Sequence, residues 1–156
     1  MFPIKNYNYE FPLSGPASFG FKRKFDYHTG IDLYCETNAE VYSIEDGIVI
    51  GVEIFTGPNA GSPWWNETYS VLIESEHHVI LYGEIETHLK LTDNVKEDDV
   101  VGSILQVLKQ DKGKNPTSML HIEQYIKGTT ESVWWKHNEL QPSNLIDITN
   151  FLKSKL

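Results

Sequence analysis

The sequence predicts an all-β domain, mostly antiparallel, that ends in a short helix. Two observations predict this class: turn residues recur along the whole chain, and the stretches between them are short and alternating or rich in β-branched residues. The length of 156 residues suits one domain with a single substantial core. We therefore expect residues 1–156 to form one domain, of which residues 1–16 are an N-terminal extension.

Strands are expected where such stretches are bounded by turns. Asp46-Gly47 is a dipeptide typical of a two-residue hairpin, and it separates the first two strands. A second hairpin is expected across residues 75–78, and the polar stretch 110–118 is expected to be a loop. The expected strands are 41–45, 48–55, 69–74, 79–82, 100–108 and 120–126.

Only the C-terminus has helical periodicity. Leu145, Ile148, Phe151 and Leu152 recur at helical spacing, and Pro142-Ser143-Asn144 offers a cap. We expect a helix over residues 142–154.

Composition excludes several classes of function. The formal net charge is −9, from 22 acidic and 13 basic residues, which argues against nucleic-acid binding. The one basic run, Lys22-Arg23-Lys24, is interpreted as a solvated turn. No apolar stretch reaches the roughly 18–20 residues that span a membrane, and residues 1–7 lack the pattern of a secretory signal, so a cytoplasmic location is expected. Cys35 is alone, so no intrachain disulfide is expected.

Three side chains are candidate zinc ligands. Catalytic zinc usually takes three protein ligands, of which His and Asp are common types, and keeps an open position. His28 and Asp32 would lie roughly 13 Å apart on a straight strand, so both reach one ion only if the chain bends at Thr29-Gly30. His121 would complete the set from a distant strand. An isolated match of this kind has little specificity, and ordinary hydrogen-bonded histidines are the alternative.

Several motifs occur together in one order. They are Ser18-Phe19-Gly20, His28-Thr29-Gly30-Ile31-Asp32-Leu33, residues 41–49, Leu81-Tyr82-Gly83, residues 92–102 and Leu120-His121-Ile122-Glu123. With these motifs the chain resembles the lysostaphin/LytM-type zinc metallopeptidases, which have the duplicated hybrid motif fold, and it looks like a divergent member. Two glycines that are usual in the family are replaced here by Thr92 and Asp98.

The resemblance implies one zinc ion, held by His28, Asp32 and His121. It also implies hydrolysis of a peptide linkage, of peptidoglycan type or glycine-rich, by water that the metal activates. The expected partner is therefore a peptide or peptidoglycan-like substrate, without nucleic acid or membrane.

The departures from the family concern its two catalytic histidines. Glu84 stands where one is expected and Met119 where the other is expected. A carboxylate cannot donate a hydrogen bond to an oxyanion when ionised, and a thioether has no proton to transfer. Three roles are open for Glu84: a general base for the attacking water, a fourth zinc ligand that closes the site, or a solvated surface carboxylate.

A substrate groove is expected beside the metal. Strand alternation would place His78 and Tyr82 on the same face as Glu84, and Met119 on the same face as His121. Trp64 and Trp65 lie in a loop that borders the groove in the family. They would either line the groove or pack beneath the loop, and the sequence does not favour one role over the other. His88 is a further candidate donor, or an ordinary loop histidine.

Two functions of different class follow. The first is a zinc-dependent peptidase with Glu84 as base. The second is a catalytically impaired domain of the same fold that binds a peptide or a protein.

Overall fold

A computed structural model describes residues 1–110 and 117–156. The expected loop at 110–118 therefore lies mostly outside the described residues. The elements are β1 (Ile31–Cys35), β2 (Glu40–Tyr42), β3 (Gly47–Thr56), η1 (Pro58–Ala60), β4 (Thr68–Glu74), β5 (His78–Glu86), β6 (Asn94–Val95), β7 (Val100–Ile104), β8 (Ser118–Ile126), β9 (Leu145–Ile146) and α1 (Thr149–Lys153).

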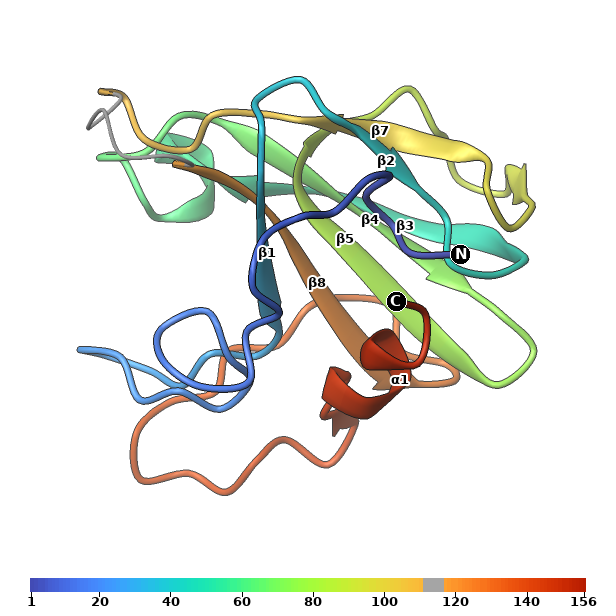
Figure 1. The fold of residues 1–156 in the computed structure, drawn as a ribbon. Helices are drawn as coiled ribbons and strands as arrows, with labels where there is room; N and C mark the ends of the chain where they lie inside the picture. Colours follow the sequence, from blue (N-terminus) through green and yellow to red (C-terminus); the bar gives the residue numbers. More distant parts are fainter. Residues whose placement is uncertain (111–116) are drawn as a thin grey trace.

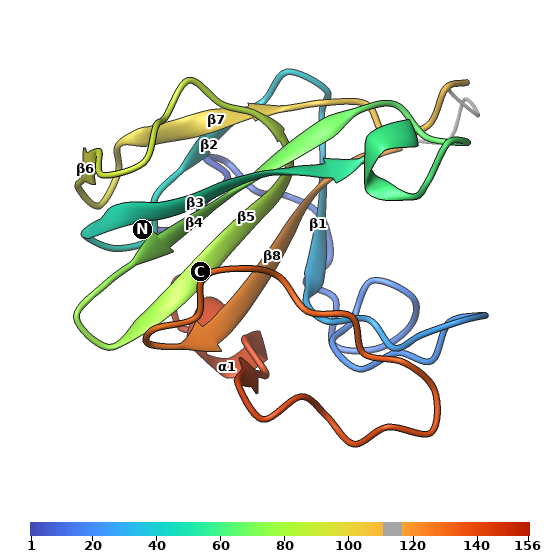
Figure 2. The same cartoon turned by 180° about the vertical axis from the view of Figure 1, so that it is seen from behind.

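The described strands form one strongly curled antiparallel sheet (Figure 1). Its main path runs β1-β8-β5-β4-β3-β6, and β9 pairs with β8. The β2–β7 pair joins the sheet where Ile104 of β7 faces Ile85 of β5. The view from behind shows the same curl, with β5 and β8 crossing the middle (Figure 2). The predicted all-β class with one short helix is confirmed.

Both faces of the sheet carry apolar side chains. The larger cluster is built from alternate residues of the central strands, including Ile80, Tyr82, Leu120 and Ile122. The smaller cluster on the opposite face includes Leu72, Leu81 and Tyr125. Because alternate residues of β8 enter different clusters, the strand has a fixed register.

One of the two expected hairpins is present. Strands β4 and β5 pair across Ser75, whose N–H donates to the carbonyl of His78 at 2.8 Å. The expected hairpin at Asp46-Gly47 is wrong: β2 pairs with β7, whereas β3 pairs with β4 and β6. The Asp46 carboxylate instead accepts from the N–H of Glu97 at 2.8 Å, so it secures the turn after β6.

The helix is shorter than expected. Leu145 and Ile146 pair with Tyr125 and Gln124 as β9, so residues expected in the first helical turn complete the sheet instead. Helix α1 begins at Thr149, whose N–H donates to the Asp147 carboxylate at 2.9 Å. Pairing of a short apolar segment with an available sheet edge has overridden the helical spacing.

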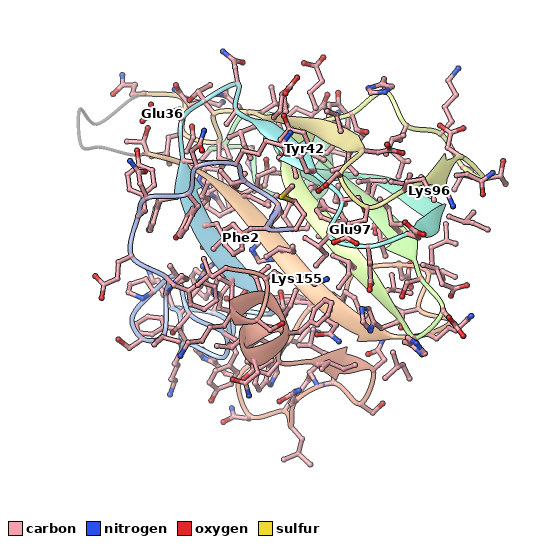
Figure 3. The ribbon with its side chains drawn as sticks, turned by 45° about the vertical axis from the view of Figure 1, so that its right-hand side comes forward. Phe2, Glu36, Tyr42, Lys96, Glu97 and Lys155 are labelled. Atoms are coloured by element: carbon pink, nitrogen blue, oxygen red, sulfur yellow. The ribbon has the colours of Figure 1, made fainter. Side chains whose placement is uncertain are left out.

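The N-terminal residues pack onto the sheet near the end of the chain (Figure 3). Phe2 and Ile4 belong to the larger cluster, so the expected extension supplies part of the core. The Lys155 ammonium lies 3.9 Å from the Glu97 carboxylate and donates to the Ile44 carbonyl at 3.2 Å. Among the described residues, no helix has the length and apolar character needed to span a membrane.

Candidate metal centre

The three predicted ligands converge. His28 Nε2 lies 3.2 Å from Asp32 Oδ1 and 3.2 Å from His121 Nδ1, and His121 Nδ1 lies 2.8 Å from Asp32 Oδ1. The three residues are 2%, 5% and 6% exposed, so their mutual contacts replace contacts with water. Within the described part of the chain, this is the one His/Cys/Asp/Glu group that meets the distance requirement for a shared metal ion.

Strand register brings the distant residues together. Asp32 of β1 is the direct partner of His121 of β8. His28 reaches them because the chain bends at Gly30 just before β1. A Cβ atom at Gly30 would lie 2.3 Å from the Ile122 carbonyl oxygen. The bend was predicted, but glycine is required there for close approach to β8 rather than for an unusual backbone angle.

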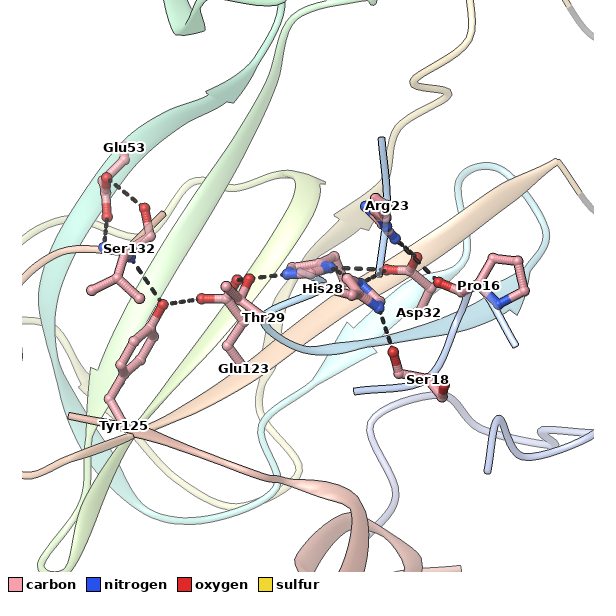
Figure 4. Close-up of polar contacts among 12 residues, drawn as sticks. Pro16, Ser18, Arg23, His28, Thr29, Asp32, Glu53, Glu123, Tyr125 and Ser132 are labelled. Atoms are coloured by element: carbon pink, nitrogen blue, oxygen red, sulfur yellow. Dashed lines mark hydrogen bonds and ion pairs between the residues drawn. The ribbon is translucent and has the colours of Figure 1, made fainter. Parts of the chain in front are cut away.

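Further hydrogen bonds orient the imidazole rings (Figure 4). His28 Nδ1 contacts the Ser18 carbonyl oxygen at 2.9 Å, and His121 Nε2 contacts Glu123 Oε1 at 2.7 Å. These carbonyl and carboxylate oxygens accept a ring N–H, which directs the other nitrogen of each ring toward the position of a metal. The Thr29 hydroxyl donates to the same Glu123 oxygen at 2.5 Å.

The hydrogen-bonded chain continues away from the ligands. Tyr125 donates its hydroxyl to Glu123 and accepts from the N–H of Val133. Glu123 is therefore buried, fully engaged and fixed in orientation. Glu123 belongs to a predicted motif, but no role was predicted for it, although its spacing of two from His121 puts both residues on the same strand face.

The electrostatics favour an added positive charge. Burial alone would raise the pKa of Asp32, but hydrogen bonds from His121 and His28 hold it well below its usual range. Burial alone would lower the pKa of His121, but its hydrogen bonds to Asp32 and Glu123 raise it to about 10. The two carboxylates thus stabilise a cation between them, and in the absence of a metal that cation is a proton.

The donor set fits zinc. Ligand atoms held at roughly 2.0–2.2 Å from a tetrahedral ion lie about 3.3–3.6 Å apart. The observed separations of 2.8, 3.2 and 3.2 Å need to open by only a few tenths of an ångström for two of the pairs, and somewhat more for the third. Two imidazole nitrogens and a carboxylate oxygen are also ligand types that zinc accepts, and both imidazoles have the expected outer partners.

Glu84 stands at a β-bulge in β5, directly after Gly83, which pairs with His121. Gly83 pairs with Ser70 and Ile85 pairs with Tyr69, so Glu84 is the additional residue, and its φ is 64°. A bulge re-aims the side chain it carries. Burial, followed by the negative charge of Asp32, raises the pKa of Glu84 to about 8. Its Oε2 atom is buried without a hydrogen-bond partner among the described residues.

The bulge separates Glu84 from the residues expected to share its face. Tyr82 is fully buried, and its hydroxyl accepts from the N–H of Ile44 at 3.0 Å, so the structure places it in the core instead of in a groove. His78 stands at the opposite end of β5, where its ring packs edge-on against Phe151. The structure therefore brings neither residue to the cluster.

The remaining predicted residues occupy different surroundings. Met119 is half-buried on β8, two residues before His121 and opposite Tyr34 of β1. Trp64 is 62% exposed in the β3–β4 loop, and its ring meets that of Trp65 edge-on at 6.0 Å. His88 lines a separate cavity of about 350 Å³, which is bordered by Glu40 and Glu86, among others.

Two side chains next to the candidate ligands were not predicted from the sequence. The ring of Phe55 lies 5.3 Å from that of His121, measured between centroids. Arg23, expected in a solvated turn, donates from Nη2 to Asp32 Oδ2 at 3.1 Å. No local pattern separates Arg23 from Lys22 and Lys24, and only the turn geometry brings it to Asp32.

Comparison with solved structures shows what fold this is. The chain is similar to the catalytic domain of the antimicrobial peptidase lysostaphin from Staphylococcus simulans, at 17% identity and a TM-score of 0.58, over 89% of this chain and 90% of that one. It is also similar to LytU, at 16% identity and a TM-score of 0.57, over 94% and 91%. At these identities the comparisons show a shared fold.

A third neighbour has the same fold. It is a variant of the catalytic domain of the prophage-encoded M23 protein EnpA from Enterococcus faecalis, at 19% identity and a TM-score of 0.51, over 82% of this chain and 100% of that one. No protein-family model matches the sequence, and no curated protein matches it either.

Proposed function

We propose that this chain is a zinc-dependent peptidase-like hydrolase of the lysostaphin/LytM type. The observation that carries the proposal is the convergence of His28 Nε2, Asp32 Oδ1 and His121 Nδ1 within 2.8–3.2 Å of one another. The fold shared with peptidase domains supports it. The proposed substrate is a peptide linkage of peptidoglycan type, with glycine or a D-amino acid beside the scissile bond.

The three ligands would hold one zinc ion. The chemistry such an ion supplies is to lower the pKa of bound water toward roughly 7 and to polarise a carbonyl group. Ser18 and Glu123 would keep the two ligand rings in the required tautomers. These contacts exist before any ion arrives, so the two rings are already oriented by their outer partners.

Glu84 is proposed as the general base. Its Oε2 would take a proton from the attacking water and return it to the leaving amine. The atom has no hydrogen-bond partner among the described residues, and its carboxyl group has a pKa of about 8 in the metal-free protein. A cation at the ligand cluster would offset the charge of Asp32 and lower that pKa, so the ionised base would predominate near neutral pH.

The test is hydrolysis of pentaglycine by zinc-loaded protein. Glu84→Gln should retain one zinc per chain and lose about 10²–10⁴-fold in rate, the usual contribution of a general base. Glu86→Gln removes an exposed carboxylate from the same strand and should leave the rate unchanged. Full activity in Glu84→Gln would reject the assigned base.

A binding-only module is the second candidate. It is favoured by Met119, which has no proton to transfer, and by the proximity of Glu84, which would close the site if it bound the ion. Substitution of zinc by Co²⁺ separates the two functions. If Glu84 is a ligand, Glu84→Gln changes the visible spectrum of the Co²⁺ protein; if it is the base, the spectrum stays the same.

A further inference from the structure

Arg23 carries a charge next to the candidate metal centre that the proposed reaction does not use. Its Nη2 atom donates to Asp32 Oδ2 at 3.1 Å and to the Pro16 carbonyl oxygen at 3.3 Å (Figure 4). The contact is with Oδ2, whereas Oδ1 is the oxygen that meets both histidines. Arg23 thus touches a ligand without occupying the position of the ion.

Most of the guanidinium remains available. Among the described residues, Nη2 is the one guanidinium nitrogen of Arg23 with a hydrogen bond, and the side chain is 39% exposed. Two contacts from one nitrogen fix the plane of the group, while Nη1 and Nε keep their donors. A guanidinium that is anchored at one corner and open elsewhere is prepared to bind a second carboxylate through charge-assisted hydrogen bonds.

The charge distribution points the same way. The chain has a net charge of −9, yet its one run of three basic residues, Lys22-Arg23-Lys24, is the segment that contacts the ligand Asp32. Without metal, the negative charge of Asp32 offsets the positive charge of Arg23. Once zinc binds Asp32, that carboxylate offsets less of the Arg23 charge. Metal binding would therefore strengthen attraction between Arg23 and an anionic substrate group.

We propose that Arg23 binds the free α-carboxylate of the substrate peptide. This inference rests on the proposed function and narrows its substrate class to short peptides, or cross-links with a free carboxyl end, whose scissile bond lies close to that carboxylate. Arg23 is then a specificity-determining residue. A backbone carbonyl group in the place of the carboxylate would bind Arg23 less tightly, because it is uncharged and has one oxygen atom where a carboxylate has two.

The experiment measures binding, so it does not depend on turnover. Dissociation constants of N-acetyltriglycine and its C-terminal amide are measured by calorimetry on zinc-loaded protein. The wild type should bind the acid at least about tenfold more tightly than the amide, a difference of about 1.4 kcal/mol. Arg23→Gln should remove this preference while binding the amide as the wild type does.

Two further variants and a zinc assay distinguish carboxylate binding by Arg23 from a role that only positions Asp32. Lys24→Gln removes a charge from the same run and should keep the preference, whereas Arg23→Lys, which lacks the planar fork, should lose most of it. Zinc content should remain one per chain in Arg23→Gln. Equal weakening of both peptides, or loss of zinc, would show that Arg23 only positions Asp32 and would overturn the inference.

The inference and the proposed function fail in different ways. A preference that persists in Arg23→Gln, equal binding of the two peptides by the wild type, or no binding of either overturns the role of Arg23. Absence of hydrolysis, with the preference intact and dependent on Arg23, overturns the peptidase activity and leaves carboxylate recognition in place.

Discussion

Glu123 Oε1 lies 2.7 Å from His121 Nε2, and this contact directs the opposite ring nitrogen toward Asp32 and His28. The relationship joins two residues on one face of β8. It makes the orientation of a ligand ring a property of the strand and its neighbours, so the ligand cluster is formed before any ion binds.

Replacement of Glu123 by Gln should therefore weaken zinc binding about 10–100-fold, the usual effect of losing such an outer carboxylate. The substitution retains size but removes the charge and allows the wrong tautomer of His121. Competition with a fluorescent chelator measures the affinity. Glu53→Gln is the matched control, because Glu53 contacts Ser132 and none of the ligands. Equal affinities for the wild type and Glu123→Gln would contradict this role.

Replacement of Gly30 by Ala should disrupt the centre. Its Cβ would lie 2.3 Å from the Ile122 carbonyl oxygen, so β1 and β8 would have to separate where Asp32 faces His121. We expect a loss of at least about 2 kcal/mol in the free energy of unfolding. Gly61→Ala, where nothing lies within 4 Å of the added atom, should cost only the roughly 1 kcal/mol of backbone strain. Urea denaturation measures both, and similar losses for the two variants would count against close approach at Gly30.

Zinc affinity should rise with pH. The pKa of His121 is raised from 6.5 to about 10 in the metal-free protein, so zinc must displace a proton at neutral pH. The apparent dissociation constant should fall about tenfold per pH unit between about pH 7 and 9, with release of one proton. Calorimetry in buffers of different ionisation enthalpy counts that proton. An affinity independent of pH over this range would mean that His121 is not a ligand.

The same proton determines how stability depends on pH without metal. Because the folded pKa of His121 exceeds its unfolded value of 6.5, its stabilising contribution is complete below pH 6.5 and is lost as pH rises toward about 10. Glu84 acts in the same pH direction: its folded pKa of about 8 exceeds its usual 4.5, so ionisation destabilises the fold progressively above pH 4.5.

Glu84→Gln should consequently raise the melting temperature of the metal-free protein at pH 9 and not at pH 5. A gain of at least several degrees is expected, since each unit of pKa shift corresponds to about 1.4 kcal/mol and each kcal/mol to roughly 2–4 °C in a domain of this size. Thermal melts in excess chelator measure it, with Glu86→Gln as the exposed control. If the two variants melt alike at pH 9, the environment described for Glu84 is incorrect.

Tyr82→Phe tests the placement of that residue in the core. Loss of the hydroxyl leaves the buried Ile44 N–H without its acceptor, which should cost about 1–3 kcal/mol of stability. Zinc affinity should stay within about twofold of the wild type. Weaker peptide binding with unchanged stability would place Tyr82 in the groove after all.

The convergence of the three candidate ligands was predictable because their residue types and the order of their motifs can be read from the sequence itself. His28, Asp32 and His121 are residue types that zinc accepts, and they belong to motifs that recur in one order. Strand alternation predicted that Met119 and His121 share one face of the strand, and they do, because β8 is regular there. The fold class followed from the same short-range patterns.

Residues controlled by tertiary structure were not predictable. The bulge at Glu84 depends on how β5 meets β4, and it breaks the alternation that was used to place His78 and Tyr82. Arg23 is one of three consecutive basic residues, and only the folded turn brings it to Asp32. β9 formed because β8 had an edge available to Leu145 and Ile146, which a helical pattern cannot reveal.

The most direct test of the central claim is anomalous diffraction at the zinc edge from crystals of the zinc-loaded protein. One peak per chain is expected, at roughly 2.0–2.2 Å from His28 Nε2, Asp32 Oδ1 and His121 Nδ1. A peak elsewhere, or none at these three atoms under stoichiometric zinc, would contradict it.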